Sequence, residues 1–65
     1  MSKLIGKFRT DGNLRLTVRR EGTWNVCTIF YPTAVTATWD VWGVGTVRRF
    51  PTLDAALAHV DSVLT

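Results

Sequence analysis

The side chains best suited to covalent chemistry in this chain are one thiol and one imidazole, Cys27 and His59. A cysteine and a histidine can form a nucleophile and its base when a third group orients the imidazole. Cys27 lies in the middle of a predicted strand, where cysteine usually behaves as a small buried hydrophobic residue. His59 lies on the solvent side of a predicted helix, and no orienting third group is evident. We therefore predict no catalytic residues and a protein that is not an enzyme.

Metal and cofactor chemistry is equally poorly supplied. Cys27 and His59 are too few for the four ligands of an ordinary zinc site. The glycines of residues 43–45 lack the spacing and the lysine of a phosphate-binding loop. Because Cys27 is the single cysteine, an intrachain disulfide is excluded. We predict no metal, no cofactor and a reduced thiol.

Positive charge is the more prominent chemical resource. Eight Lys and Arg residues face five Asp and Glu, which gives a net charge of +3, and most of the basic residues are arginine. Arginine pairs with phosphate or carboxylate through two parallel hydrogen bonds, which lysine does not form. One interpretation is a surface that binds phosphates. The other is the ordinary net charge that keeps a small domain soluble.

Strand alternation places much of this charge on one side of the first hairpin. We predict that Leu14, Leu16 and Val18 face the core, so that Arg15 and Arg19 face outward, and the preceding strand adds basic residues to the same face. The residues on this outer face are Lys3, Lys7, Arg9, Arg15 and Arg19. Such segregation is typical of a surface that neutralises phosphates. A solvated strand face that discourages edge-to-edge aggregation has the same composition.

A second basic region precedes the helix, where Arg48 and Arg49 lie close in sequence to Trp42 and Phe50. Arginine beside an exposed aromatic ring can stack on bases or contact a protein surface. Alternatively, Phe50 and one tryptophan anchor the helix to the sheet. Trp39 and Trp42 fall on opposite strand faces, so one of them points away from the helix unless a bulge re-aims it.

Turn residues and alternation divide the chain into strands that position these side chains. The predicted strands cover residues 3–9, 14–20, 23–31, 36–42 and 46–50. Asp11-Gly12 and Glu21-Gly22 are typical of tight hairpin turns. Residues 23–31 are apolar on both faces, which favours a central strand. The glycines at 43 and 45 leave two alternatives for residues 36–50, namely two strands or one bent strand.

A helix over about residues 53–64 completes the chain. Thr52 can cap its first N–H groups and Asp54 lies in its first turn. Leu53, Leu57 and Val60 begin an apolar stripe at helical spacing that continues to residue 64. A helix this short must pack on the sheet to persist. We predict one α+β domain over residues 1–65, an antiparallel meander of four to five strands packed on one face by a C-terminal helix.

The late strand with Trp39 and the helix start Phe50-Pro51-Thr52-Leu53-Asp54-Ala55-Ala56 resemble in outline small sheet-plus-helix DNA-binding domains. Those domains occur at the N-terminus of tyrosine-type integrases and in AP2-like modules. The resemblance covers roughly the last half of the chain and implies a sheet face placed in a DNA major groove, without assigning residue roles. A chain of this size also looks like the small accessory proteins of bacteriophages, including inhibitors of host defence such as anti-CRISPR proteins.

No sequence window approaches the roughly 20 apolar residues of a membrane span, and residues 1–7 lack the apolar core of a signal peptide. We expect a soluble cytoplasmic protein with no membrane partner. The first hypothesis is a binding module whose basic sheet face meets nucleic acid or a nucleoprotein surface, with Trp42, Arg48 and Arg49 as a second contact region. The alternative is a protein-interaction module, or a phage-type inhibitor of a host nucleic-acid-processing complex such as a CRISPR complex. It would act through exposed aromatic and Arg residues, as a monomer or a homodimer.

Overall fold

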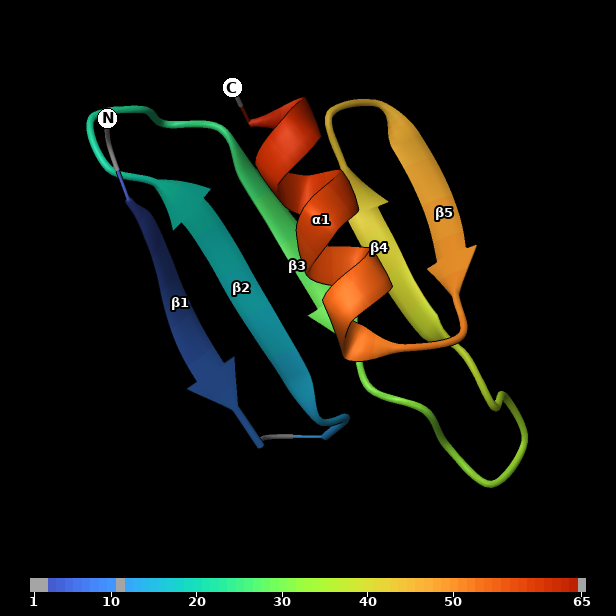
Figure 1. The fold of residues 1–65 in the computed structure, drawn as a ribbon. Coiled ribbons are helices and arrows are strands. Elements are labelled where there is room, and N and C mark those ends of the chain that lie inside the picture. The colour runs from blue at the N-terminus through green and yellow to red at the C-terminus, as the bar shows by residue number, and fades with distance from the viewer. Residues whose placement is uncertain (1–2, 11, 65) are drawn as a thin grey trace.

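The computed structural model describes residues 3–10 and 12–64. Over these residues the chain forms five strands and one helix: β1 (Leu4–Arg9), β2 (Arg15–Arg20), β3 (Val26–Phe30), β4 (Trp39–Gly43), β5 (Thr46–Phe50) and α1 (Leu53–Val63). Each strand pairs antiparallel with the next, so the sheet order is β1-β2-β3-β4-β5 (Figure 1). The α+β meander with a C-terminal helix on one face is thereby confirmed. None of the described residues form a helix long and apolar enough to cross a membrane.

Two of the strand predictions are confirmed by the pairing. β3 is the central strand, as its apolar character on both faces indicated. Residues 36–50 hold two strands, because Val44 and Gly45 form a tight turn in which both residues have positive φ, 52° and 74°. Turns with positive φ at both central positions suit the twist of a two-residue hairpin. Gly43, just before this turn, has no room for a side chain, since an added Cβ would lie 2.8 Å from the carbonyl oxygen of Val26.

The predicted boundaries of the third and fourth strands were wrong by several residues. β3 begins at Val26, because the N–H and the hydroxyl of Thr23 both donate to the carbonyl oxygen of Arg20, at 3.1 and 3.0 Å, and extend the turn. β4 begins at Trp39. The loop before it is organised by Thr33, whose Oγ1 accepts hydrogen bonds from the N–H of residues 35 and 36 at 3.2 and 2.9 Å. Local hydrogen bonds of this kind compete with strand pairing.

The helix begins and ends as its capping residues dictate. Thr52 accepts a hydrogen bond from the N–H of Ala55 at 3.2 Å, and Asp54 occupies the first turn. The N–H of Leu64 donates to the carbonyl oxygen of Val60 at 2.9 Å, so residue 64 closes the helix. The apolar stripe faces the sheet as predicted.

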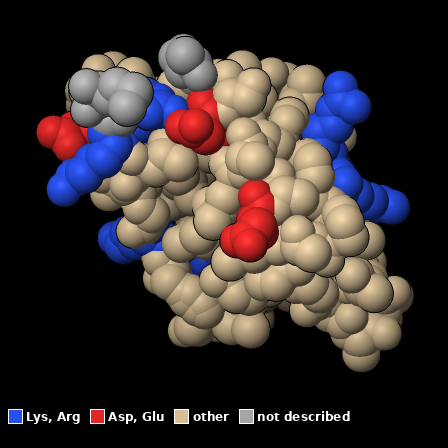
Figure 2. All heavy atoms as spheres, viewed as in Figure 1, with Lys and Arg blue, Asp and Glu red and all other residues tan. Residues whose placement is uncertain are grey.

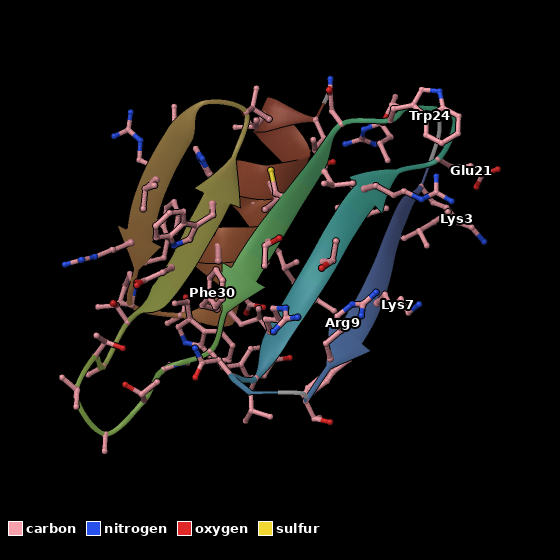
Figure 3. All side chains as sticks on the ribbon, turned by 180° about the vertical axis from the view of Figure 1, so that it is seen from behind. Lys3, Lys7, Arg9, Glu21, Trp24 and Phe30 are labelled. Atoms are coloured by element: carbon pink, nitrogen blue, oxygen red, sulfur yellow. The ribbon has the colours of Figure 1, made fainter. Side chains whose placement is uncertain are left out.

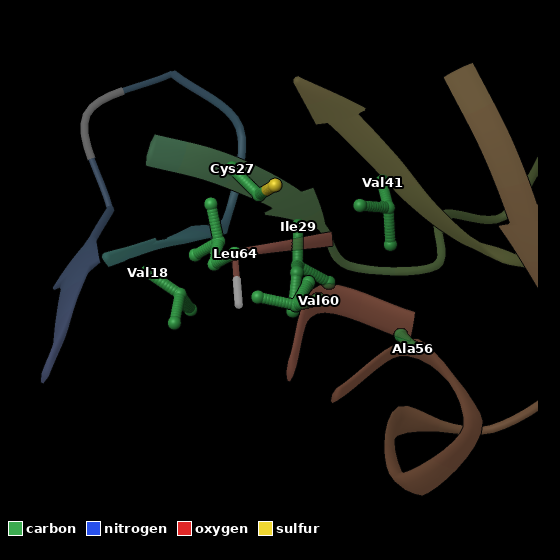
Figure 4. Close-up of a cluster of buried hydrophobic side chains, with 7 residues drawn as sticks. All are labelled: Val18, Cys27, Ile29, Val41, Ala56, Val60 and Leu64. Atoms are coloured by element: carbon green, nitrogen blue, oxygen red, sulfur yellow. The ribbon is translucent and has the colours of Figure 1, made fainter. Parts of the chain in front are cut away.

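An apolar cluster lies between the helix and the sheet (Figure 4). Its buried members are Val18, Cys27, Ile29 and Val41 from the strands and Ala56, Val60 and Leu64 from the helical segment. Leu16 packs against this cluster from the side. The prediction that Leu14 also faces the core was wrong: it precedes β2 and is 48% exposed.

The helix covers only part of its side of the sheet. It packs chiefly on β4 and β5, and Figure 1 shows the β1–β2 hairpin extending beyond it. Next to the helix, the ring of Tyr31 lies 5.3 Å from that of Phe8 and 4.6 Å from that of Trp39, between centroids. This aromatic row links the uncovered hairpin to the core. Phe8 nevertheless remains 46% exposed.

Candidate nucleic-acid interface

The opposite side of the sheet carries no helix, and we call it the open face (Figure 3). Directly opposed residues of an antiparallel pair point to the same side, and chain neighbours point to opposite sides. Because Val18, Ile29 and Val41 face the helix, their neighbours form the open face. The strand residues placed there are Ile5, Lys7, Arg9, Arg15, Thr17, Arg19, Val26, Thr28, Phe30, Asp40, Trp42, Val47 and Arg49.

Basic residues occupy the β1–β2 half of the open face. Lys7, Arg9 and Arg19 are exposed and Arg15 is half-buried. Lys3 is exposed one residue before β1, where it continues the alternation. Arg9 lies directly opposite Arg15 in the strand pairing. Their side chains therefore point to the same side of the sheet.

The β3–β5 half of the open face is aromatic. The ring centroids of Phe30 and Trp42 are 6.0 Å apart, with the planes at 75°. Trp42 is 52% exposed, so the tryptophan that points away from the helix is Trp42 and not Trp39. Arg49 lies on the same face on the adjacent strand β5. The basic half and the aromatic half therefore form one continuous surface.

Arg48 does not belong to this surface. Chain neighbours in a strand alternate, and Arg48 pairs with the buried Val41, which places it on the helix side. The predicted second contact region of Trp42, Arg48 and Arg49 is thus divided between the two sides of the sheet. Trp42 and Arg49 remain together.

Asp40 is the acidic residue that the pairing places on the open face, opposite Phe30 and Arg49. Its Oδ1 accepts a hydrogen bond from the hydroxyl of Thr38 at 2.8 Å and lies 3.9 Å from Nε of Arg49. A shallow pocket of about 250 Å³ opens beside it, at the end of β3. The lining residues are Asn13, Phe30, Tyr31, Thr33, Thr36, Asp40 and Trp42.

The other described acidic residues lie off the open face. Asp54 and Asp61 belong to the helix, and Glu21 lies in the β2–β3 turn, where its N–H donates to the carbonyl oxygen of Lys3 at 2.9 Å. Figure 2 views the helix side, where acidic groups gather over the helix and basic groups lie at the margins. Asp11, assigned above to a turn, lies outside the described residues. Basic residues thus outnumber acidic ones on the open face, while Arg20 and Arg48 lie on the helix side.

Sequence reasoning missed the most exposed aromatic residue. Trp24 lies in the loop between β2 and β3 and is 97% exposed, although the sequence analysis placed it in a strand. The sequence feature that could have predicted this position is Gly22, because Trp24 follows it by only two residues and therefore still lies close to the turn. Arg19, Val26 and the loop itself border a second shallow hollow beside it.

The structure places Cys27 in the core and His59 at the partly buried edge of the helix. Cys27 is 1% exposed, and burial raises the pKa of its thiol, which disfavours the reactive thiolate. His59 is half-buried against Phe50, with ring centroids 5.1 Å apart, whereas we had expected it on the solvent side. Within residues 3–10 and 12–64, no three His, Cys, Asp or Glu side chains are grouped so as to hold a metal ion.

The chain is thus a small α+β domain with a sheet that is largely basic and aromatic on one side and partly covered by a helix on the other. Searches against protein-family models, curated proteins and solved structures found no match for the chain. The function must therefore be argued from the geometry of the chain itself.

Proposed function

We propose that this protein is a non-catalytic module that binds nucleic acid through its open face in the cytoplasm. The observation that carries the proposal is the placement of Lys7, Arg9, Arg15, Arg19 and Arg49 on the side of the sheet without a helix, against a single acidic residue among the described strand residues there. Neutralising several phosphates releases their counterions and drives binding. A face that needed only to stay soluble would not require this excess of positive charge.

The two halves of the open face would have different tasks. Phosphates would lie over the exposed cations of β1 and β2. Bases would stack on Phe30 and Trp42, because every base has a π face that an aromatic side chain can contact. Neighbouring strands are about 4.8 Å apart, so five strands give a surface roughly 19 Å wide between its outer strands, which suits a few nucleotides.

The test is a titration of tryptophan fluorescence with short single- and double-stranded DNA and RNA at low and at near-physiological salt. We expect saturable binding. The logarithm of the association constant should fall linearly with the logarithm of the salt concentration, with a slope of about −0.7 to −0.9 for each phosphate contacted. The double variant Lys7→Gln/Arg19→Gln should bind more weakly and with a shallower salt slope. Arg48→Gln removes one charge from the opposite side and is the control, with effects compared for each charge removed. Absence of binding at low salt would overturn the proposal.

A second function is favoured by a different observation. Trp24 is 97% exposed, and Val26 beside it is 42% exposed. Exposed tryptophan is typical of the residues that dominate protein interfaces. The second candidate is a protein-interaction module, such as a phage-type inhibitor of a nucleic-acid-processing complex. In that case Trp24→Ala should abolish binding to the partner protein, whereas Lys7→Gln/Arg19→Gln should have little effect on it. Sedimentation equilibrium would show whether that partner is a second copy of the chain.

A further inference from the structure

The pocket beside Asp40 combines aromatic side chains with polar groups. Trp42 and Phe30 provide the rings, while Asp40, Asn13 and Thr33 provide oxygen and nitrogen atoms. Tyr31 donates its N–H to the carbonyl oxygen of Leu14 at 3.1 Å. This hydrogen bond holds the first hairpin turn, with Asn13, against the loop that follows β3.

The dimensions of the pocket favour a small planar aromatic group. Its volume is about 250 Å³. Pockets for drug-sized ligands are slightly larger, at roughly 300 to 1,000 Å³. Trp42 is 52% exposed, so part of the indole is available for stacking. Nucleobases stack favourably on an exposed aromatic side chain of this kind. A nucleobase matches this combination of size and flatness.

The polar groups favour one base over the others. Oδ1 of Asp40 accepts from Thr38, but a carboxylate has two oxygens and about four acceptor positions, which leaves capacity for a ligand. Guanine presents two adjacent N–H donors, on N1 and N2, along its Watson–Crick edge. Adenine and cytosine place an acceptor beside their amino group, and uracil and thymine place one N–H between two carbonyls. A carboxylate can therefore accept two hydrogen bonds only from guanine.

We propose that the Asp40 pocket binds a guanine base of a single-stranded nucleic acid, stacked against Trp42 with its Watson–Crick edge toward Asp40. This inference rests on the proposed function and gives the open face a base preference. The strand must be single, because a duplex hides both the ring face and the Watson–Crick edge. Arg49 on the adjacent strand and the cations of β1 and β2 would hold the flanking phosphates, which favours a strand over a free nucleotide.

The experiment compares three short oligothymidylates that differ in one central base: guanine, hypoxanthine or adenine. Binding is followed by fluorescence anisotropy of a terminal dye on the oligonucleotide. We expect the wild-type protein to bind the guanine oligomer about tenfold more tightly than the adenine one. Hypoxanthine lacks the N2 amino group, so that oligomer should lose most of the advantage. Guanosine monophosphate alone should bind far more weakly than the guanine oligomer.

Asp40→Asn then tests the carboxylate. We expect the ratio of guanine to adenine affinity to fall to about one, while overall affinity is kept or raised because a negative charge has been removed. Asp54→Asn, a matched change on the helix, should keep the preference. The wild-type comparison of guanine with hypoxanthine needs no variant, so it decides the matter even if Asp40→Asn does not fold.

The outcomes separate the two proposals. Equal wild-type affinity for the three oligomers would overturn the guanine site while leaving nucleic-acid binding intact. No binding of any oligomer at low salt would overturn both. If guanosine monophosphate bound as tightly as the guanine oligomer, the pocket would be a site for a free nucleotide, and the proposal of a base within a strand would be overturned.

Discussion

Arg20 donates a hydrogen bond from Nε to the carbonyl oxygen of Leu64, 2.9 Å away and 44 residues later in the chain. Its Nη2 donates to the carbonyl oxygen of Asp61 at 3.1 Å and forms an ion pair with the carboxylate of the same residue. The last carbonyls of a helix lack partners within it, and this helix has no basic residue in its last turn. Arg20 supplies that charge from the end of β2.

We predict that Arg20→Ala destabilises the domain by about 2 kcal/mol, because hydrogen bonds to charged groups contribute about 1.5–3 kcal/mol. The side chain of Arg20 is only 16% exposed, so water would not fully replace the lost contacts. Arg19→Ala is the matched control on the opposite side and should change stability by less than about 0.5 kcal/mol. Urea denaturation followed by circular dichroism measures both. Equal losses would show that Arg20 does not tie the helix to the sheet.

The β4–β5 turn offers a stabilising substitution. Val44 has a φ of 52°, a conformation that a β-branched residue adopts only at a cost of about 1–3 kcal/mol. Val44→Asn creates the Asn-Gly pair that such turns prefer, and we expect the free energy of unfolding to rise by about 1 kcal/mol. Val47→Asn, inside β5, should lower it. Thermal denaturation that shows no gain for Val44→Asn would contradict the strain at this turn.

Adjacent arginines on β5 test the sidedness of the binding surface. Arg49 shares the open face with Trp42, whereas Arg48 lies on the helix side. We expect Arg49→Gln to weaken oligonucleotide binding and to reduce the salt slope by about one. Arg48→Gln should leave both nearly unchanged. Comparable losses in the two variants would mean that net charge, and not its placement, determines binding.

Burial of Cys27 gives the domain a dependence on alkaline pH. The pKa of the thiol is raised by burial, so this group contributes stability that is fully present below the ordinary pKa of a cysteine thiol. That contribution is lost as the pH rises through the higher pKa of the folded state. Between neutral and strongly alkaline pH, the wild type should therefore lose more unfolding free energy than Cys27→Ala does. Parallel urea titrations of both proteins measure the difference, and identical losses would contradict it.

The alternation of Leu16, Thr17 and Val18 was sufficient to predict the two sides of β2, because one side of a strand is buried and the other is not. The stripe from Leu53 to Leu64 predicted the helix for the same reason. Both patterns arise because one side of the element is buried in the core and the other side is exposed to solvent.

Features that depend on loop geometry escaped prediction. The residues around Trp24 have the composition of a strand, but the two hydrogen bonds of Thr23 extend the turn and leave Trp24 in the loop. Arg20 occupies an inward position of β2, which is a visible anomaly, but its partner is 44 residues distant. The Asp40 pocket joins a hairpin turn to a later loop. No local pattern encodes such long-range contacts.

The limited reach of the helix has a consequence for how the molecule opens. β1 contributes no buried residue to the core and is an outer strand of the sheet, held chiefly by its pairing with β2. Its amide protons should therefore exchange with solvent by a local opening that needs less free energy than global unfolding. Lys7 and Arg9 on this strand lie on the open face. A nucleic acid that bridges β1 to the central strands would slow that exchange. The amide protons of β1 should therefore show the largest change in exchange rate when the protein binds its ligand.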